Sequence, residues 1–119
     1  MTSEKDVSAF LEAFKVKMKV WQVLFRDDRG KNMQTLLDLE LKPADRVKVL
    51  EALEISNYSQ GPVPDDLHKG PEMWVFGSKV KNREVYIKIT MGLPGTSVIC
   101  ISFHLATYNM TYPFKAMKT

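Results

Sequence analysis

The C-terminal half of the chain contains three runs of β-forming residues that follow one another with only short turns between them. The runs are EMWVFGSKV, REVYIKITMG and VICISFHLA, and they are separated by KN and LPGTS. Apolar residues alternate with other residues in each run, which is the period of a strand that buries one face. Three such runs joined by short turns predict an antiparallel meander. The register of this meander decides which side chains share a face, so it constrains the fold more than any other feature.

Residues that face one another across antiparallel strands have a constant sum of residue numbers. A two-residue turn at 81–82 and a second turn centred on Gly95 fix the two sums. The predicted opposite pairs are Val80 with Arg83, Lys79 with Glu84, Gly77 with Tyr86, Tyr86 with His104, and Lys88 with Ser102. Gly77 is expected to leave open space beside the tyrosine.

This register divides the side chains between two faces. One face is almost entirely apolar and predicts the core, with Trp74, Phe76, Val85, Ile87, Ile89, Ile99, Ile101, Phe103 and Leu105. The other face carries Lys79, Glu84, Tyr86, Lys88, Ser102 and His104, and the alternation places Cys100 there as well. Antiparallel sheets usually have a polar outer face, so this surface fits an ordinary solvent-facing side as well as a functional site.

The first half of the chain is predicted to be helical. Apolar residues at three- and four-residue spacing from Val7 to Met18 predict an amphipathic helix that Thr2 or Ser3 caps. The segment 19–25 is either a short strand or the extension of this helix. Two further helices are expected, one over 33–41 and one that begins at Pro43, a residue favoured at the first helical position.

These elements predict an α+β fold in which N-terminal helices pack on a three- to four-stranded antiparallel sheet. The chain of 119 residues is expected to form a single domain, residues 1–119. Its helical half spans about 1–57, a Gly- and Pro-rich loop spans 58–71, and the sheet spans about 72–114. The tail TYNMTYPFK is a candidate for the fourth, edge strand.

Composition limits the function classes. The net charge of +3 suits a polyanionic ligand without requiring one. No apolar run approaches the roughly 20 residues that span a bilayer, so no membrane association is expected, and no signal peptide is visible. The single cysteine excludes an internal disulfide and predicts a reducing, cytoplasmic setting.

The residue types on the polar face suffice for cleavage of RNA without a metal. Such cleavage needs a base for the 2′-hydroxyl, a cation or donor for the phosphorane charge, and an acid for the leaving oxygen. His104 could be base or acid, Lys88 could stabilise phosphate charge, and Tyr86 could donate to a phosphate oxygen or share the proton transfers. Arg83, Lys79 and Lys81 could hold flanking phosphates.

Two other chemistries have less support. His68 and His104 could bind a metal together with carboxylates, but no ligand-spacing motif exists in the sequence. Cys100 could pair with His104 as a nucleophile, although a lone strand cysteine is usually a small packed residue.

The segments DLELKPADRVKVLEAL, YSQGP, MWVFG, VYIKI and ICISFH, in this order, resemble the MqsR family of toxin–antitoxin mRNA interferases. The resemblance covers nearly the whole chain. It implies a RelE-type fold and an endoribonuclease that cleaves mRNA and is neutralised by a co-encoded antitoxin. The strand tyrosine of the family falls on Tyr86, whereas His104 replaces a lysine. Val75 stands in place of a glutamine, and Ser59, next to Tyr58, in place of a second lysine.

We therefore predict a bacterial toxin that cleaves single-stranded mRNA, free or on the ribosome, without metal or cofactor. The predicted products are a cyclic phosphate and a free 5′-hydroxyl. The predicted catalytic residues are Tyr86, His104 and Lys88, and the predicted substrate contacts are Arg83, Lys79, Lys81, Tyr58, Ser102 and Tyr112. The alternative is a non-enzymatic module that binds protein or nucleic acid through the polar sheet face.

Overall fold

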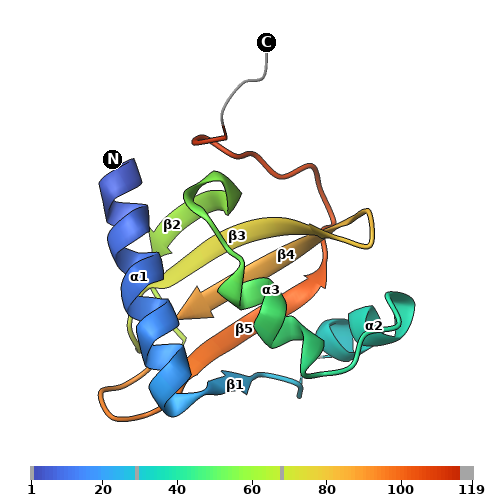
Figure 1. The fold of residues 1–119 in the computed structure, drawn as a ribbon, viewed down its shortest axis with the longest axis horizontal. Helices are drawn as coiled ribbons and strands as arrows, with labels where there is room; N and C mark the ends of the chain where they lie inside the picture. The colour runs from blue at the N-terminus through green and yellow to red at the C-terminus, as the bar shows by residue number, and fades with distance from the viewer. Residues whose placement is uncertain (1, 29, 68, 116–119) are drawn as a thin grey trace.

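A computed structural model describes residues 2–28, 30–67 and 69–115 of the chain. Its elements follow the order α1 (Glu4–Trp21), β1 (Val23–Phe25), α2 (Gly30–Asp38), α3 (Asp45–Glu51), the 3₁₀ turn η1 (Ile55–Asn57), β2 (Tyr58–Val63), β3 (Met73–Val80), β4 (Arg83–Thr90) and β5 (Val98–Leu105). The strands form one sheet in the order β1-β5-β4-β3-β2. Helices α1 and α3 lie over one face of this sheet (Figure 1). The α+β class is therefore confirmed.

The sheet is larger and more mixed than the predicted antiparallel meander. It has five strands, and β1 pairs with β5 in parallel. The segment 19–25 was expected to be either a short strand or an extension of the first helix, and it contains both. Helix α1 ends at Trp21, and β1 begins at Val23. Between them Gln22 has a φ of 70°, which breaks the helix. Strand β2 occupies the first part of the predicted loop 58–71, and the tail after Leu105 forms no strand up to residue 115.

Helix α1 supplies the apolar layer that covers the sheet. The Ser3 hydroxyl accepts a hydrogen bond from the Asp6 N–H, and the Asp6 carboxylate accepts one from the Ser3 N–H, which forms a capping box. All members of the predicted stripe, Val7, Phe10, Leu11, Phe14 and Met18, are buried. The ring of Phe10 stacks on that of Trp74 with centroids 4.6 Å apart. This ring contact joins α1 to β3.

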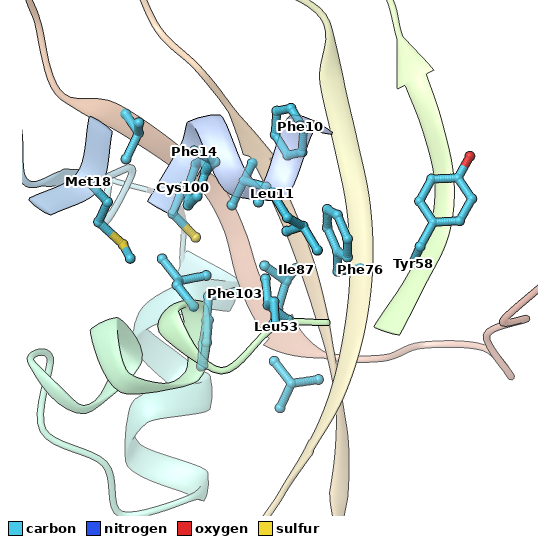
Figure 2. Packing of buried hydrophobic residues seen from close by; sticks show 14 of the residues in the cluster. Phe10, Leu11, Phe14, Met18, Leu53, Tyr58, Phe76, Ile87, Cys100 and Phe103 are labelled. Carbon is cyan, nitrogen blue, oxygen red and sulfur yellow. The ribbon is translucent and has the colours of Figure 1, made fainter. Parts of the chain in front are cut away.

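The core lies between α1, α3 and the sheet, as Figure 2 shows. Phe76, Ile87 and Phe103 come from three neighbouring strands and are fully buried. Leu50 of α3 and Leu53, just after it, are buried in the same cluster. The predicted core face of β3 and β4 is confirmed by this packing.

A β-bulge in β5 changes the predicted face of that strand. All five predicted opposite pairs are present. After Lys88 pairs with Ser102, however, Ile89 pairs with Cys100. Ile101 is therefore skipped by the pairing and is an extra residue in β5. From Val98 to Cys100, on the N-terminal side of this bulge, each side chain lies on the face opposite to the predicted one. Cys100 and Val98 face the core, whereas Ile99 and Ile101 face away from it, which corrects the prediction for both isoleucines and for Cys100.

Helix α2 covers the edge of β5 where β1 ends. The amide of Asn32 donates to the carbonyls of Arg26 and Ile101, and its oxygen accepts from the Phe103 N–H. The Thr35 hydroxyl accepts from the Leu105 N–H. These side chains replace the ladder bonds of a missing neighbour strand. No helix among the described residues is long and apolar enough to cross a membrane.

Candidate functional site

The centre of the outer sheet face is a stacked pair formed by Tyr86 of β4 and His104 of β5. The two residues are direct cross-strand partners, and their rings lie 5.1 Å apart at an interplanar angle of 10°. Tyr108, in the segment after β5, meets the Tyr86 ring edge-on at 6.3 Å. The sheet register and this aromatic contact together hold the imidazole in one orientation.

The hydrogen bonding of His104 assigns its tautomer. Nδ1 lies 3.0 Å from the carbonyl oxygen of Leu105. Because a carbonyl oxygen only accepts, Nδ1 must carry a hydrogen for this bond to form. In the neutral ring Nε2 is then without hydrogen and can accept a proton from a substrate.

Lys88 completes the central group. Its ammonium nitrogen lies 5.9 Å from the centroid of the Tyr86 ring, on the same face and two residues along β4. Its cross-strand partner Ser102 is only 3% exposed. The structure thus brings together an imidazole, a phenol and an ammonium, with Ser102 beneath them and scarcely accessible. We call Tyr86, Lys88 and His104 the central trio.

Three further cations lie where β3 turns into β4. Lys81 and Asn82 have φ values of 51° and 67°, which identify a type I′ turn that suits a tight hairpin. Lys79, Lys81 and Arg83 are exposed there, so all three predicted phosphate contacts are on the surface. The ammonium of Lys81 donates to the carbonyl of Glu40 at 3.3 Å. Lys81 is therefore tied in part to the end of α2.

Tyr112 occupies the space that Gly77 was expected to leave open. A Cβ atom at Gly77 would lie 2.1 Å from the Tyr112 hydroxyl oxygen. That hydroxyl donates to Glu84 at 2.7 Å. Burial, together with the hydrogen bond to Glu84, raises the pKa of Tyr112 far above its ordinary value. Tyr112 therefore belongs to the packing of the tail on the sheet, and its hydroxyl is already engaged.

Tyr58 is removed from the substrate surface by its burial, which corrects its predicted role. It is the first residue of β2 and only 5% exposed. Its ring stacks on Phe114 at 5.4 Å, and its hydroxyl donates to the carbonyl of Gly61. Tyr58 lies in the core cluster of Figure 2 and cannot reach a ligand on the opposite face.

Among the described residues there is neither an accessible nucleophilic cysteine nor a group of side chains that could hold a metal. Cys100 is fully buried on the core side, and burial raises the pKa of its thiol to about 12, so the nucleophilic thiolate does not form near neutral pH. The bulge directs it away from the face that carries His104. In the described part of the chain no three His, Cys, Asp or Glu residues are grouped to hold a metal. His68 lies outside the described residues.

A cavity of about 530 Å³ lies beside the central trio on the same face. Its floor includes Thr90, Ile99 and Ile101, and its sides are formed by Asp65, Leu67 and the segments 69–71 and 92–93. Arg26 and Asp28, which follow β1, complete the wall. Sequence analysis missed this cavity, because it depends on the bulge that turns both isoleucines outward. No local pattern in the sequence marks that bulge.

Comparisons of the chain with models of known protein families, with curated proteins and with solved structures found no match. Function is therefore inferred from the side chains of the outer sheet face.

Proposed function

We propose that the protein is a toxin-like endoribonuclease that cleaves single-stranded mRNA by metal-independent acid–base catalysis. The observation that carries this proposal is the central trio. Tyr86 and His104 are stacked, Nε2 of His104 is available as an acceptor, and Lys88 lies beside them. Lys79 is exposed on the same sheet face as Tyr86, and the exposed Lys81 and Arg83 add positive charge at the adjacent hairpin turn. We propose these cations as contacts for flanking phosphates.

In the proposed reaction Nε2 of His104 accepts the proton of the ribose 2′-hydroxyl. The 2′-oxygen attacks the adjacent phosphorus, and the bond from phosphorus to the 5′-oxygen breaks. The leaving oxygen takes a proton from Tyr86 or from the imidazolium. Lys88 stabilises the additional negative charge on the phosphorane oxygens. The products are a 2′,3′-cyclic phosphate and a 5′-hydroxyl, so atoms and charge balance without a co-reactant.

The resemblance to MqsR toxins supports the finer parts of the proposal. On that basis we propose a RelE-type arrangement of helices on the sheet, mRNA as the substrate, a cytoplasmic setting and neutralisation by a cognate antitoxin. The replacement of a family lysine by His104 keeps a proton-transfer group on the sheet face, and imidazole is the better shuttle near pH 7.

The test is incubation of the purified protein with a long RNA in EDTA, with and without ribosomes. We expect cleavage by the wild type and losses on the order of 10²-fold or more for His104→Ala and for Tyr86→Phe, the usual worth of a general acid or base. Tyr108→Phe is the matched control, because it removes a hydroxyl from the neighbouring ring that is 52% exposed. This control is expected to cleave as the wild type does.

Intact RNA under all conditions would refute the nuclease and favour the alternative, a module that binds protein or nucleic acid through the same face. Undiminished cleavage by both variants would refute the assignment of the site while leaving the activity. Terminal analysis of the fragments tests the mechanism. A 5′-phosphate in place of a 5′-hydroxyl would contradict attack by the 2′-oxygen.

A further inference from the structure

The tail that follows β5, residues 106–115, returns across the sheet. The Ala106 N–H donates to the backbone carbonyl of Glu84 on β4 at 2.9 Å, which continues the pairing of β5 by one residue. At the other end of the tail the ring of Phe114 stacks on that of Tyr58, the first residue of β2. The tail therefore extends from the end of β5 to the edge strand β2 (Figure 1).

One carboxylate fastens the middle of this tail. Oε2 of Glu84 accepts a hydrogen bond from the Tyr112 hydroxyl at 2.7 Å, and Oε1 accepts one from the Met110 N–H at 3.5 Å. Met110 is 8% exposed, so the tail is packed closely at this point. Hydrogen bonds to an ionised acceptor are stronger than those between neutral groups. Glu84 therefore holds the tail through its backbone carbonyl and through both carboxylate oxygens.

Tyr108 lies midway between the two tail residues whose N–H groups donate to Glu84. Its backbone is thus held two residues away on either side, although its side chain is 52% exposed. The Tyr108 ring meets the Tyr86 ring edge-on, with centroids 6.3 Å apart and an interplanar angle of 66°. Tyr86 in turn stacks on His104. A chain of contacts therefore connects the Glu84 carboxylate to the two rings of the proposed reaction.

The sheet alone does not fix the orientation of those rings. Cross-strand pairing sets the backbone positions of Tyr86 and His104, but each ring can still turn about its side-chain bonds. An aromatic neighbour in an edge-on arrangement restricts that rotation. Proton transfer depends closely on such restriction, since a displacement of about 1 Å can lower a rate about 100-fold.

We propose that Glu84 is a positioning residue of the nuclease, which holds Tyr108 against Tyr86 and so fixes the orientation of the pair formed by Tyr86 and His104. This inference rests on the proposed cleavage of RNA. Glu84 takes no part in the chemistry, because its two carboxylate oxygens are engaged by donors of the tail. The role depends on these hydrogen bonds and not on the negative charge.

The first test compares Glu84→Ala with Glu84→Gln in steady-state cleavage of a long RNA. Alanine removes both side-chain bonds, whereas glutamine can accept from the Met110 N–H and donate to the Tyr112 hydroxyl oxygen. We expect Glu84→Ala to lower kcat about tenfold or more, with KM changed less than about twofold. Glu84→Gln should stay within about threefold of the wild type. Glu51→Ala, which removes an exposed carboxylate of α3, is the control and should cleave as the wild type does.

The second test asks whether Glu84 acts through the Tyr108 ring. Tyr108→Ala should lower kcat by a factor similar to that of Glu84→Ala, whereas Tyr108→Phe keeps the ring and should not lower it. The double variant with alanine at both positions should be no slower than the slower single variant, because both changes remove the same restraint. Losses that multiply in the double variant would overturn the inference.

Nuclear magnetic resonance gives a readout that does not depend on cleavage. In the wild type and in Glu84→Gln, nuclear Overhauser effects should connect the ring of Tyr86 to the rings of Tyr108 and His104. In Glu84→Ala the effect between Tyr86 and Tyr108 should be lost, and the ring proton shifts of His104 should change. Unchanged amide shifts in α1 show that the variant is folded.

The outcomes separate the two proposals. Wild-type kcat in Glu84→Ala, or a retained contact between Tyr86 and Tyr108, would overturn the inference and leave the nuclease. A loss in Glu84→Gln equal to that in Glu84→Ala would overturn it as well, because the effect would then come from the charge. A higher KM with unchanged kcat would assign Glu84 to substrate binding instead. Intact RNA with the wild type would refute the nuclease, and the resonance experiment would still decide whether Glu84 orients the two rings.

Discussion

At the scale of single residues, Gly77 determines where the C-terminal segment lies. Any larger residue would place its Cβ 2.1 Å from the Tyr112 hydroxyl oxygen and 2.9 Å from two ring carbons. The glycine sits opposite Tyr86, so the tyrosine of the tail lies on the sheet face next to the central trio. A small residue in the middle of β3 therefore allows the tail to pack there.

We predict that Gly77→Ala destabilises the protein by about 1–3 kcal/mol, as overpacking of a filled site does. The cause is displacement of Tyr112, so the cost should be much smaller in a Tyr112→Ala background. Chemical denaturation of the wild type, both single variants and the double variant measures this coupling. Gly30→Ala is the control, because nothing lies within 4 Å of its Cβ position.

If the losses of unfolding free energy in the two single variants add up in the double variant, displacement of Tyr112 is not the cause. The effect would then be assigned to the backbone of β3. The predicted loss of the Tyr112 hydrogen bond to Glu84 also gives a direct readout. A crystal structure of Gly77→Ala should show the tyrosine moved from the sheet face.

Cross-strand pairs of residues could be predicted wherever a short turn fixed the sum of the numbers of the two facing residues. Tyr86 with His104 and Lys88 with Ser102 are both confirmed. The face of Cys100 was not predictable, because an extra residue at Ile101 leaves no trace in a run of alternating side chains. The occupant of the space at Gly77 was also unpredictable, since Tyr112 is far from it in sequence.

At the scale of elements, α2 acts as a substitute for a neighbour strand of β5. Asn32 is 2% exposed and bonds to three backbone groups, the carbonyls of Arg26 and Ile101 and the N–H of Phe103. A single side chain thus connects the end of β1, the bulge of β5 and the strand beyond it. The geometry of the cavity depends on this connection.

We predict that Asn32→Ala lowers the free energy of unfolding by about 3 kcal/mol, because it leaves buried backbone groups without partners. Hydrogen exchange at the Phe103 amide should accelerate, whereas the Leu105 amide, held by Thr35, should change less. Gln34→Ala on the same helix is the control, since its bond to Asp38 is exposed. Equal acceleration at both amides would indicate that α2 detaches as a unit.

Elements were predictable where their own residues determine them. The stripe of α1 and the three strands from 73 to 105 fall close to their predicted positions. Strand β1 was only one of two alternatives, because three residues have no periodicity of their own and their pairing partner lies more than seventy residues away. Strand β2 was predicted as loop, since its sequence YSQGPV contains Gly61 and Pro62.

At the scale of the whole molecule, one buried ion pair joins α3 to the segment between β1 and α2. Arg46 is 1% exposed, and its guanidinium donates to both oxygens of Asp27, at 2.6 and 2.9 Å. It also lies 3.9 Å above the ring of Phe25 and donates to the carbonyl of Pro43. The hydrogen bonds from Arg46 hold the pKa of Asp27 below its ordinary value.

This pair makes the stability of the whole protein depend on pH in the acid range. A carboxyl group whose pKa is lowered on folding contributes its full stabilisation above its unfolded pKa of about 3.9, and this stabilisation is lost as the pH falls through the lower folded value.

Asp27→Asn should therefore lower the free energy of unfolding by about 2–3 kcal/mol at pH 7, near the lower end for a buried pair because Asp27 is partly exposed. The difference from the wild type should stay constant down to about pH 5 and shrink below pH 4. Denaturant unfolding at a series of pH values measures it, with Asp66→Asn, in an exposed carboxyl group, as the control. A difference that does not change between pH 7 and pH 2 would show that Asp27 stabilises the fold by packing rather than by its charge.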